Sequence, residues 1–361
     1  MPLISAETCR AQIIAVLSAW GMDPKLIETT AEVMIETDLA GVDSHGISML
    51  MTYEKRLQEG KLKINARPKI ERRTACTALI DAGAGLGHPV SAYGMNLAVD
   101  MAKEAGLGVV GVRNSHHFGA AGVYARIAAR RGAIGLVTSA TRGVTMVPTR
   151  GAKPVLGTNP IAFAAPAGRN LPFVLDMATT TTAAGKVKVY DLNERAMPAG
   201  WVVDGAGNPI TDAKRGMKIL HEEPEGGLSP LGGSPEMASH KGYGLAMMVH
   251  ILGGTLVGSS FSPIRNRMQK PNDPDDIGHF FMAIDPGAFR APGEFEADLD
   301  AVIDELHATP AADPAKPVLV AGDPEEGERQ RRLKHGIPVP PALDKHIRDI
   351  CARSGAAYLL S

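Results

Sequence analysis

Apolar residues recur every three to four positions through most of the first sixty residues, the spacing of amphipathic helices. Ser5 and Asp23 precede two such patterns as capping residues, and Pro24 suits a first helical turn. A third pattern spans 47–59, and each of the three ends at a glycine. The sequence therefore predicts three helices, with His45 in a turn at or just before a helix N-terminus. The helix dipole there lowers an imidazole pKa.

From residue 77 onward, short apolar runs alternate with helical patterns. The pattern predicts strands and helices in the order βαβαβ, at 77–82, 89–105, 107–113, 120–131 and 133–139. This order is typical of a Rossmann fold, and GAGLGH lies where a dinucleotide fingerprint would. The third glycine of G-x-G-x-x-G falls on His88, so the fingerprint is incomplete.

The second half of the chain is less regular. Short strands and turns are predicted over 154–205, including GKVKVY, and a long apolar helix from about 241. The polar segment 263–277 is predicted to be mobile, and GHFFMAIDP to be a buried strand. Helical patterns follow at 292–308 and 341–355. The basic run between them is predicted to be a solvated helix face and comprises Arg329, Arg331, Arg332 and Lys334.

Composition narrows the class of protein. The 38 Lys and Arg residues balance 39 Asp and Glu residues, so no basic excess indicates a nucleic-acid partner. Three cysteines lie far apart without metal-ligand spacing, which favours the reduced cytoplasm. We expect no signal peptide and no membrane span, because no apolar run has the required length or flanks.

Two histidine-containing turns are the candidates for proton chemistry. Ser44 precedes His45, and a hydroxyl beside an imidazole can orient the ring or relay its proton. The alternative is that Ser44 caps a helix and His45 is an ordinary turn residue. The second turn, SHHFG at 115–119, lies between a predicted strand and a predicted helix, where ligands meet helix N-termini. It equally fits a capping loop.

Two further positions have polar groups that suit a nucleotide. Asp176 ends an apolar strand and could accept hydrogen bonds from ribose, or simply cap the next turn. His240 and Lys241 begin a helix, where a lysine and free amides can hold a phosphate or a carboxylate, or simply face solvent. Neighbouring histidines rarely chelate one ion, and no ligand spacing predicts a metal site.

Seven motifs, read together, resemble one enzyme family. In order they are VDSHGI, NSHHFGAAG, GTNPIAFAAP, LDMATT, SHKGYGLA, GHFFMAIDP and a late GDPE followed by RRLKHGIP. They span about residues 40 to 340. They resemble the malate/L-lactate dehydrogenase family of the second, non-Rossmann type. That family includes ureidoglycolate, sulfolactate and hydroxycarboxylate dehydrogenases and cyclic imino acid reductases.

The resemblance implies a fold unlike βαβαβ. It implies an α/β, non-Rossmann nicotinamide-binding fold with a largely antiparallel sheet and a helical lobe formed from both termini. We expect a helical part at 1–75, a catalytic and NAD(P)-binding core at 76–310, and a C-terminal helical part at 311–361. A homodimer with its site near the subunit contact is also implied. The activity implied is NAD- or NADP-dependent interconversion of a 2-oxo acid and a 2-hydroxy acid.

The resemblance also assigns residues. His45 matches the proton donor, Ser44 its relay partner, and His117 a second histidine that some members use as acid or base. Thr158 matches a substrate contact. The expected cofactor contacts are His117, Phe118, Gly119, Ala120, Ala121, Ser139, Leu175, Asp176, Met177, Ala178, His240, Lys241, Gly322 and Asp323.

The sequence departs from the family at two positions. Met49 stands where many members have an arginine that clamps the substrate carboxylate, and an arginine fork is the simplest way to hold that group. Arg142, Lys186 and Lys188 are the candidate replacements. Lys188 also stands near where some members place an acid in the relay. Met49 would give an adaptable apolar wall, which favours bulkier substrates.

Other functions are also open at this stage. Within the family, a cyclic imino acid reductase or a ureidoglycolate-type dehydrogenase fits the same motifs. A metal-dependent lyase or hydrolase could use the histidine clusters, but it needs an ion that the spacing does not predict. A non-catalytic dinucleotide sensor would bind cofactor without turning over a 2-oxo acid.

Overall fold

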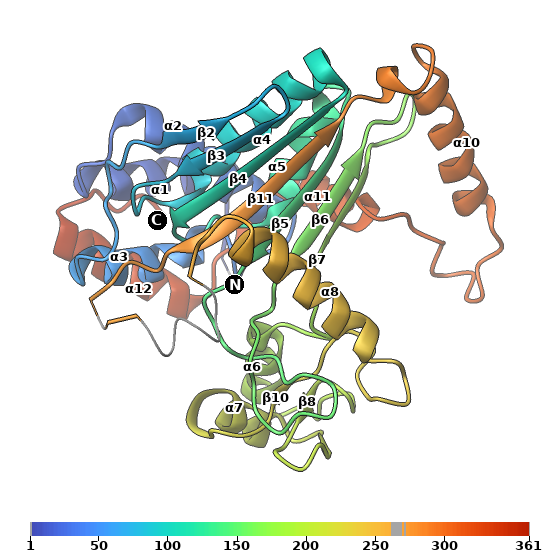
Figure 1. Cartoon of the computed structure of the whole chain (residues 1–361). Helices are drawn as coiled ribbons and strands as arrows, with labels where there is room; N and C mark the ends of the chain where they lie inside the picture. The colour runs from blue at the N-terminus through green and yellow to red at the C-terminus, as the bar shows by residue number, and fades with distance from the viewer. Residues whose placement is uncertain (1, 261–268, 271, 361) are drawn as a thin grey trace.

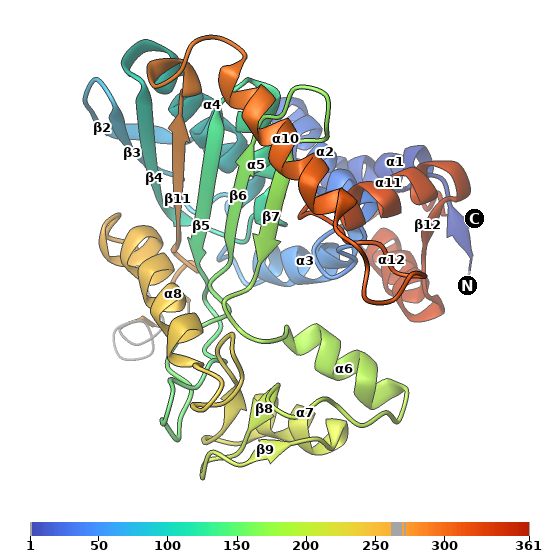
Figure 2. The same ribbon diagram turned by 90° about the vertical axis from the view of Figure 1, so that its right-hand side faces the viewer.

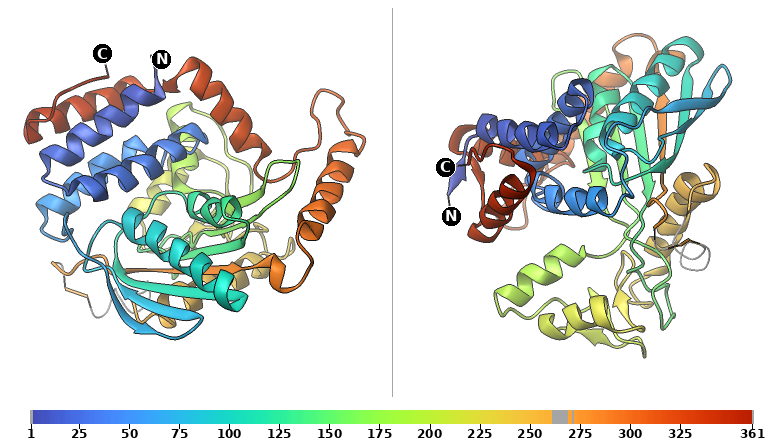
Figure 3. Two further views of the ribbon diagram at one scale, coloured as in Figure 1. Left: turned by 90° about the horizontal axis from the view of Figure 1, so that it is seen from above. Right: turned by 90° about the vertical axis from the view of Figure 1, so that its left-hand side faces the viewer.

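The computed structural model describes residues 2–260, 269–270 and 272–360. A helical lobe joins the two ends of the chain, which lie close together (Figures 1 and 3). Its N-terminal elements are α1 (Ala6–Ala19), α2 (Pro24–Leu39), the 3-10 turn η1 (Ile47–Met49) and α3 (Leu50–Gln58). Its C-terminal elements are α11 (Asp323–His335) and α12 (Pro341–Ser354). Strand β1 (Leu3–Ile4) pairs with β12 (Ile337–Pro338).

The predicted caps form in this lobe. The Ser5 hydroxyl accepts from the Thr8 amide at 3.0 Å, and the Asp23 carboxylate from the Lys25 amide at 2.9 Å. A shared apolar core, which includes Ile13 and Ile347, fixes the lobe. The two termini therefore depend on each other for burial. This confirms the helical lobe that the family resemblance implies.

A seven-stranded sheet forms the centre of the molecule, in the order β2-β3-β4-β11-β5-β6-β7. Among the described strands of this sheet only β3 and β4 run parallel, and the other neighbours are antiparallel. The strands are β2 (Lys69–Arg73), β3 (Thr77–Asp81), β4 (Leu107–Ser115), β5 (Ile134–Ala140), β6 (Ile161–Ala165), β7 (Phe173–Met177) and β11 (Ile277–Ile284).

The Rossmann interpretation of residues 77–139 is therefore wrong, although each predicted element is present. The buried strand β11, from far along the chain, lies between β4 and β5 and pairs antiparallel with both. A β-carbon on Gly87 would lie 2.5 Å from the His116 carbonyl oxygen. Gly87 therefore lets the start of the following helix pack closely against the backbone of His116. This packing explains a glycine of GAGLGH without a dinucleotide fingerprint.

Helices cover both faces of the sheet (Figures 1 and 3). Helices α4 (Gly87–Ala105) and α5 (Ala121–Arg130) pack on one face through a large apolar core. Helix α8 (His240–His250) and the π-helical turn Ile251–Thr255 pack on the other. The layers leave the strand ends near Ser115, Ala140 and Met177 beside the helical lobe.

A small third body lies below the sheet (Figure 2). It contains α6 (Ala184–Leu192), α7 (Ala213–Glu222) and the short strands β8 (Val202–Val203), β9 (Pro209–Ile210) and β10 (Gly227–Leu228). The prediction of a strand or turn at GKVKVY is wrong, because residues 185–190 lie in α6. Only Val187 of its two valines is buried, whereas Val189 is exposed, so the Lys-Val alternation does not reflect a sheet face.

The remaining described elements are the 3-10 turn η3 (Pro286–Ala288) and α10 (Glu294–Ala308). The segment predicted to be mobile, 263–277, lies partly outside the described residues, since 261–268 and 271 are not described. Across the described ranges, no helix combines the length and apolar character that a bilayer crossing requires.

Candidate active site

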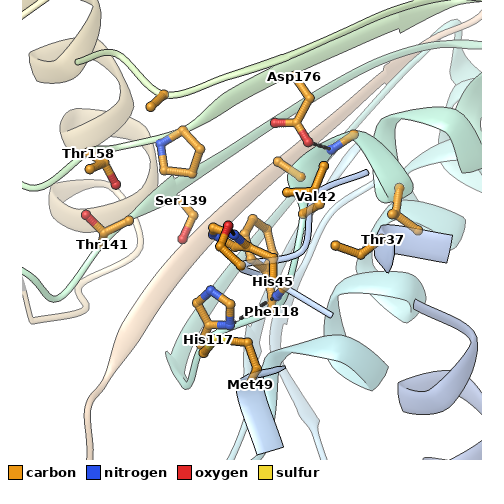
Figure 4. Close-up of a pocket in the computed structure, with 18 of the residues that line it drawn as sticks. Thr37, Val42, His45, Met49, His117, Phe118, Ser139, Thr141, Thr158 and Asp176 are labelled. Carbon is orange, nitrogen blue, oxygen red and sulfur yellow. Dashed lines mark hydrogen bonds between the residues drawn. The ribbon is translucent and has the colours of Figure 1, made fainter. Parts of the chain in front are cut away.

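A cavity of about 1050 Å³ lies where the helical lobe meets the sheet. Its wall comes from α2, the 41–49 turn, α3, the start of α5, the ends of β5 and β7, and the segment before β11. Figure 4 shows His45, Met49, His117, Phe118, Ser139, Thr158 and Asp176 around it. The cavity thus brings together residues from five of the seven motifs, the fifth being GDPE through Glu325.

His45 lies half-buried in the cavity wall, with its Nδ1 2.7 Å from the Ser44 hydroxyl. Burial lowers the pKa of His45 below its usual value of 6.5. The direction is the one that the sequence predicts, and its cause in the structure is burial. His45 is therefore mostly neutral at pH 7 in the free protein.

The turn that carries His45 is anchored from beneath by Asp38. Its carboxylate accepts from the Ile47 amide at 2.8 Å, and a β-carbon on Gly46 would lie 1.9 Å from its Oδ1. Burial raises the pKa of Asp38 to about 8, although the hydrogen bond from Ile47 opposes this. Only glycine fits position 46, so this glycine sets the course of the turn.

Arg332 anchors the same turn from the C-terminal helix α11. It is 4% exposed, donates to the Asp38 carbonyl oxygen at 2.8 Å and pairs with the carboxylates of Asp43 and Glu328. The prediction of a solvated face for the whole basic run is therefore wrong at Arg332, although its neighbour Arg331 is exposed. Arg329 also faces the protein and pairs with Glu36 of α2 at 3.0 Å, so only part of the basic run faces solvent.

His117 lies opposite His45, with the ring centroids 5.2 Å apart. Its Nδ1 is 2.8 Å from the Tyr53 hydroxyl and 3.3 Å from the Gly119 amide nitrogen. Burial, together with the neighbouring His45, lowers the pKa of His117 well below its usual value. The cavity therefore holds two neutral imidazoles in different hydrogen-bonding environments.

Most of the expected cofactor contacts line the cavity: His117, Phe118, Gly119, Ala120, Ala121, Ser139, Asp176, Met177 and Ala178. The Asp176 carboxylate accepts from the Gly122 amide at 2.7 Å, at the start of α5. The surrounding protein raises the pKa of Asp176 to about 6, and Glu325 adds to the effect, although solvent reaches the side chain through the cavity. Thr158, the expected substrate contact, also lines the cavity.

Other expected contacts do not line the cavity within one chain: Leu175, Lys186, His240, Lys241, Gly322 and Asp323. The Lys186 ammonium lies 5.3 Å from the centroid of the Trp201 ring, in the small body. Lys188 is exposed on the same helix. From the late segment after Gly322, Glu325 lines the cavity instead.

Two arginines supply the positive charge that Met49 does not. Arg142 Nε lies 3.0 Å and Arg56 Nε 3.2 Å from the Asp275 carboxylate, and all three residues line the cavity. Burial alone would raise the pKa of Asp275, but the hydrogen bond and charge of His116 and the two guanidinium charges lower it to about 2. Sequence reasoning missed Arg56, whose signal is its spacing: Met49 and Arg56 are seven residues apart, two turns along one helix face.

The described residues around the cavity do not form a set of metal ligands. Among the described residues, no group of three or more His, Cys, Asp or Glu side chains is placed to hold an ion. The histidines of the cavity instead contact hydroxyls, amides and one another.

Comparison with known proteins shows the family to which this chain is similar. A family model described as malate/L-lactate dehydrogenase matches residues 4–348. The chain belongs to this family. It is 35% identical to the malate dehydrogenase of Pyrococcus horikoshii over 349 residues, which cover 96% of this chain and 94% of the relative.

Solved structures of similar proteins have the same fold. The malate dehydrogenase of Entamoeba histolytica superposes with a TM-score of 0.94 at 30% identity, covering 99% of both chains. The delta1-piperideine-2-carboxylate reductase of Pseudomonas syringae pvar. tomato gives 0.81 at 29% identity, covering 97% of this chain and 100% of that one. The resemblance inferred from the seven motifs is therefore confirmed.

Replacing Arg332 by methionine should destabilise the protein and disturb the 42–47 turn. The Asp38 carbonyl oxygen would lose a charge-assisted hydrogen bond, which contributes about 1.5–3 kcal/mol. The Asp43 pair adds little because Asp43 is solvent-exposed. Urea unfolding of Arg332→Met measures the loss. Arg331→Met, an exposed neighbour, is the control and should leave the free energy of unfolding nearly unchanged. Equal effects in the two variants would contradict the anchoring role.

Proposed function

We propose that this chain is an NAD(P)-dependent dehydrogenase that interconverts a 2-oxo acid and a 2-hydroxy acid. The observation that carries the proposal is the shared cavity. It places a neutral histidine with a hydroxyl on Nδ1 beside a loop of small residues and two arginines. Family membership supports the same reaction class. A histidine for the proton, a cation for the carboxylate and room for a dinucleotide are the parts that this reaction requires.

His45 is the proton donor and acceptor in this proposal. In reduction, the His45 imidazolium protonates the oxygen that forms at C2, and in oxidation neutral His45 removes the hydroxyl proton. Ser44 holds Nδ1, so Nε2 is the exchanging nitrogen. Proton transfer of this kind contributes roughly 10²–10⁴-fold to the rate. The lowered pKa of His45 favours the base form that oxidation needs.

The part of the cavity lined by Phe118–Gly122 fits a nicotinamide dinucleotide. The cavity lies at the upper end of the usual ligand-pocket range of about 300–1,000 Å³. Small residues let a ligand approach the backbone at the start of α5, and Asp176 can accept hydrogen bonds from ribose hydroxyls. When bound, the reduced nicotinamide supplies the hydride. Whether the chain prefers NAD or NADP is the first quantity to measure.

Arg142 is the proposed partner of the substrate carboxylate. Its Nε is held by Asp275, which leaves the Nη end of the guanidinium as the part to face a ligand. Arg56 shares the same carboxylate and also pairs with Glu59 at 2.8 Å, so Arg142 is the arginine better placed to meet the substrate. This pair takes the place of the arginine that many family members have at position 49.

Met49 is the proposed wall for the substrate side chain. It lines the cavity, and a thioether adapts to apolar groups of different shape. We infer a substrate bulkier than pyruvate, such as an aryl-substituted 2-oxo acid. Similarity to a piperideine-2-carboxylate reductase supports a cyclic imino acid as the second candidate, and a ureidoglycolate-type substrate is the third.

We also propose a homodimer, as the resemblance implies. Ile251 and Leu256 are 51% and 63% exposed near the π-helical turn, and apolar surface of this kind favours association. Sedimentation equilibrium measures the state directly, and a monomer at all concentrations would contradict the proposal.

Nicotinamide absorbance tests the function. Purified protein is assayed with each cofactor against pyruvate, oxaloacetate, phenylpyruvate, oxidised ureidoglycolate and cyclic imines. We expect turnover of a bulky 2-oxo acid, and we expect Met49→Arg to shift preference toward oxaloacetate because a guanidinium replaces the apolar wall. Cofactor binding without turnover on any compound would disprove the substrate class. Loss of activity with a chelator and no need for a nicotinamide would favour the metal-dependent alternative.

His45→Ala should lower kcat by roughly 10²–10⁴-fold while cofactor affinity stays near that of the wild type. In the wild type, kcat/KM for oxidation should fall only as the pH drops below 6.5, since the pKa of His45 is lowered from that value. Stopped-flow and steady-state rates across pH measure both. Full activity in His45→Ala would move the proton-transfer role to His117.

Arg142→Met should lower kcat/KM for the acid by roughly 10–100-fold, because a hydrogen bond to a charged group contributes about 1.5–3 kcal/mol. Most of the change should appear in KM. Arg113→Met is the matched control, since Arg113 pairs with Glu71 at 2.8 Å outside the cavity. An unchanged KM in Arg142→Met would assign the carboxylate to Arg56.

A further inference from the structure

The two cavity histidines differ in what faces Nδ1. On His45 that nitrogen meets the Ser44 hydroxyl at 2.7 Å. A hydroxyl can donate or accept. The contact therefore survives whether Nδ1 carries a hydrogen or a lone pair, and His45 can gain and lose a proton on Nε2 without breaking it.

His117 has a partner that cannot change its role. The Gly119 amide nitrogen lies 3.3 Å from Nδ1, and a backbone N–H only donates. Nδ1 must therefore keep its lone pair, which leaves the hydrogen of the neutral ring on Nε2. Gly119 adopts a φ of +80°, a conformation that L side chains rarely adopt, and this turn directs its amide back at the ring.

Tyr53 completes the arrangement from α3. Its hydroxyl is buried, 2.8 Å from His117 Nδ1 and 3.3 Å from His88 Nε2. Burial, and to a smaller extent the nearby His279, lowers the pKa of His88 to about 3, so His88 is neutral. One assignment satisfies every contact: His88 Nε2–H donates to the Tyr53 oxygen, and the Tyr53 hydroxyl donates to His117. The reverse assignment would set a ring N–H against the Gly119 N–H.

We propose that Tyr53 is a positioning residue that, with the Gly119 amide, locks His117 as a neutral hydrogen-bond donor through Nε2, so that His45 alone exchanges the proton. This inference rests on the proposed function. Figure 4 shows the second ring nitrogen of His117 turned away from its dashed hydrogen bond and toward the cavity. His117 is then a donor aimed at a substrate oxygen, a role distinct from that of His45.

The groups that face His117 favour the same state. Burial has the largest effect on its pKa, and His45, His88 and His279 lower it further, whereas Asp275 alone raises it. The Tyr53 hydroxyl is itself kept protonated, because burial raises its pKa well above 10. A second proton on His117 would therefore place a buried charge among imidazoles and an N–H against an N–H.

A neutral donor of this kind is useful in the proposed reaction. It stabilises negative charge that develops on a substrate oxygen and gives up no proton. With the two rings 5.2 Å apart, one small substrate can contact both. Only His45 has a partner on Nδ1 that tolerates both protonation states of the ring. His117 therefore does not compete with His45 for the proton.

The lock can be tested without any assay of activity. Nitrogen-15 NMR of the full chain with labelled histidine reports which nitrogen is protonated, and His117→Gln assigns the signal. We expect the Nε2–H form of His117, with no titration near pH 6.5. Tyr53→Phe should move population out of that form and raise the apparent pKa. Tyr124→Phe removes an equally buried hydroxyl that donates to the Phe118 carbonyl, and it should leave the His117 signal unchanged.

Kinetics test the division of roles. A glutamine amide can place an N–H near the position of imidazole Nε2, so His117→Gln should lower kcat by roughly tenfold or less. His45→Gln should lower it by roughly 10²–10⁴-fold, because an amide cannot exchange the proton. Equal losses in the two variants, or an Nδ1–H form of His117 in the spectrum, would overturn the lock. An inactive wild type would refute the proposed function, and the spectrum would still decide the lock.

Discussion

The site depends on the anchoring of the 42–47 turn between two buried groups from distant parts of the chain. Asp38 fixes the turn through the Ile47 amide, and Arg332 reaches it from the C-terminal helix. Gly46 is squeezed against Asp38, so the backbone has one course. Because the turn carries Ser44 and His45, the packing of the two chain ends into one lobe determines where the proton-exchanging group lies. Fold stability and site geometry are therefore coupled at this point.

Local pattern predicted most elements but not their neighbours. The helices at 89–105 and 120–131 and the strands around them form almost as expected, because periodicity and glycine stops are local signals. The strand order could not follow from them. Strand β11 reaches its place between β4 and β5 by a pairing across more than a hundred residues, and nothing near residue 110 encodes it. The family resemblance implied only that the sheet is largely antiparallel, and the order of its strands became visible once the chain was folded.

The site was predictable where chemistry lies in contiguous motifs. His45, His117 and Asp176 all belong to such motifs, and all three line the cavity. Arg56 and Arg332 do not stand out, because arginines on helices usually face solvent and only the packed lobe turns these two inward. From the sequence Lys186 was a candidate to bind the substrate carboxylate. Its helix belongs to the small body, where the ammonium group lies over the ring of Trp201.

The roles of the two imidazoles follow from their partners rather than from their type. Both rings are half-buried in the cavity wall, and burial keeps both mostly neutral in the free protein. A hydroxyl on Nδ1 leaves His45 able to change state, whereas an amide on Nδ1 holds His117 in one state. In the sequence both positions are simply histidines, so the sequence alone gives His45 and His117 the same possible roles in proton transfer and hydrogen bonding. The difference arises from a glycine with positive φ and a tyrosine on another helix, which is why it becomes visible only once the chain is folded.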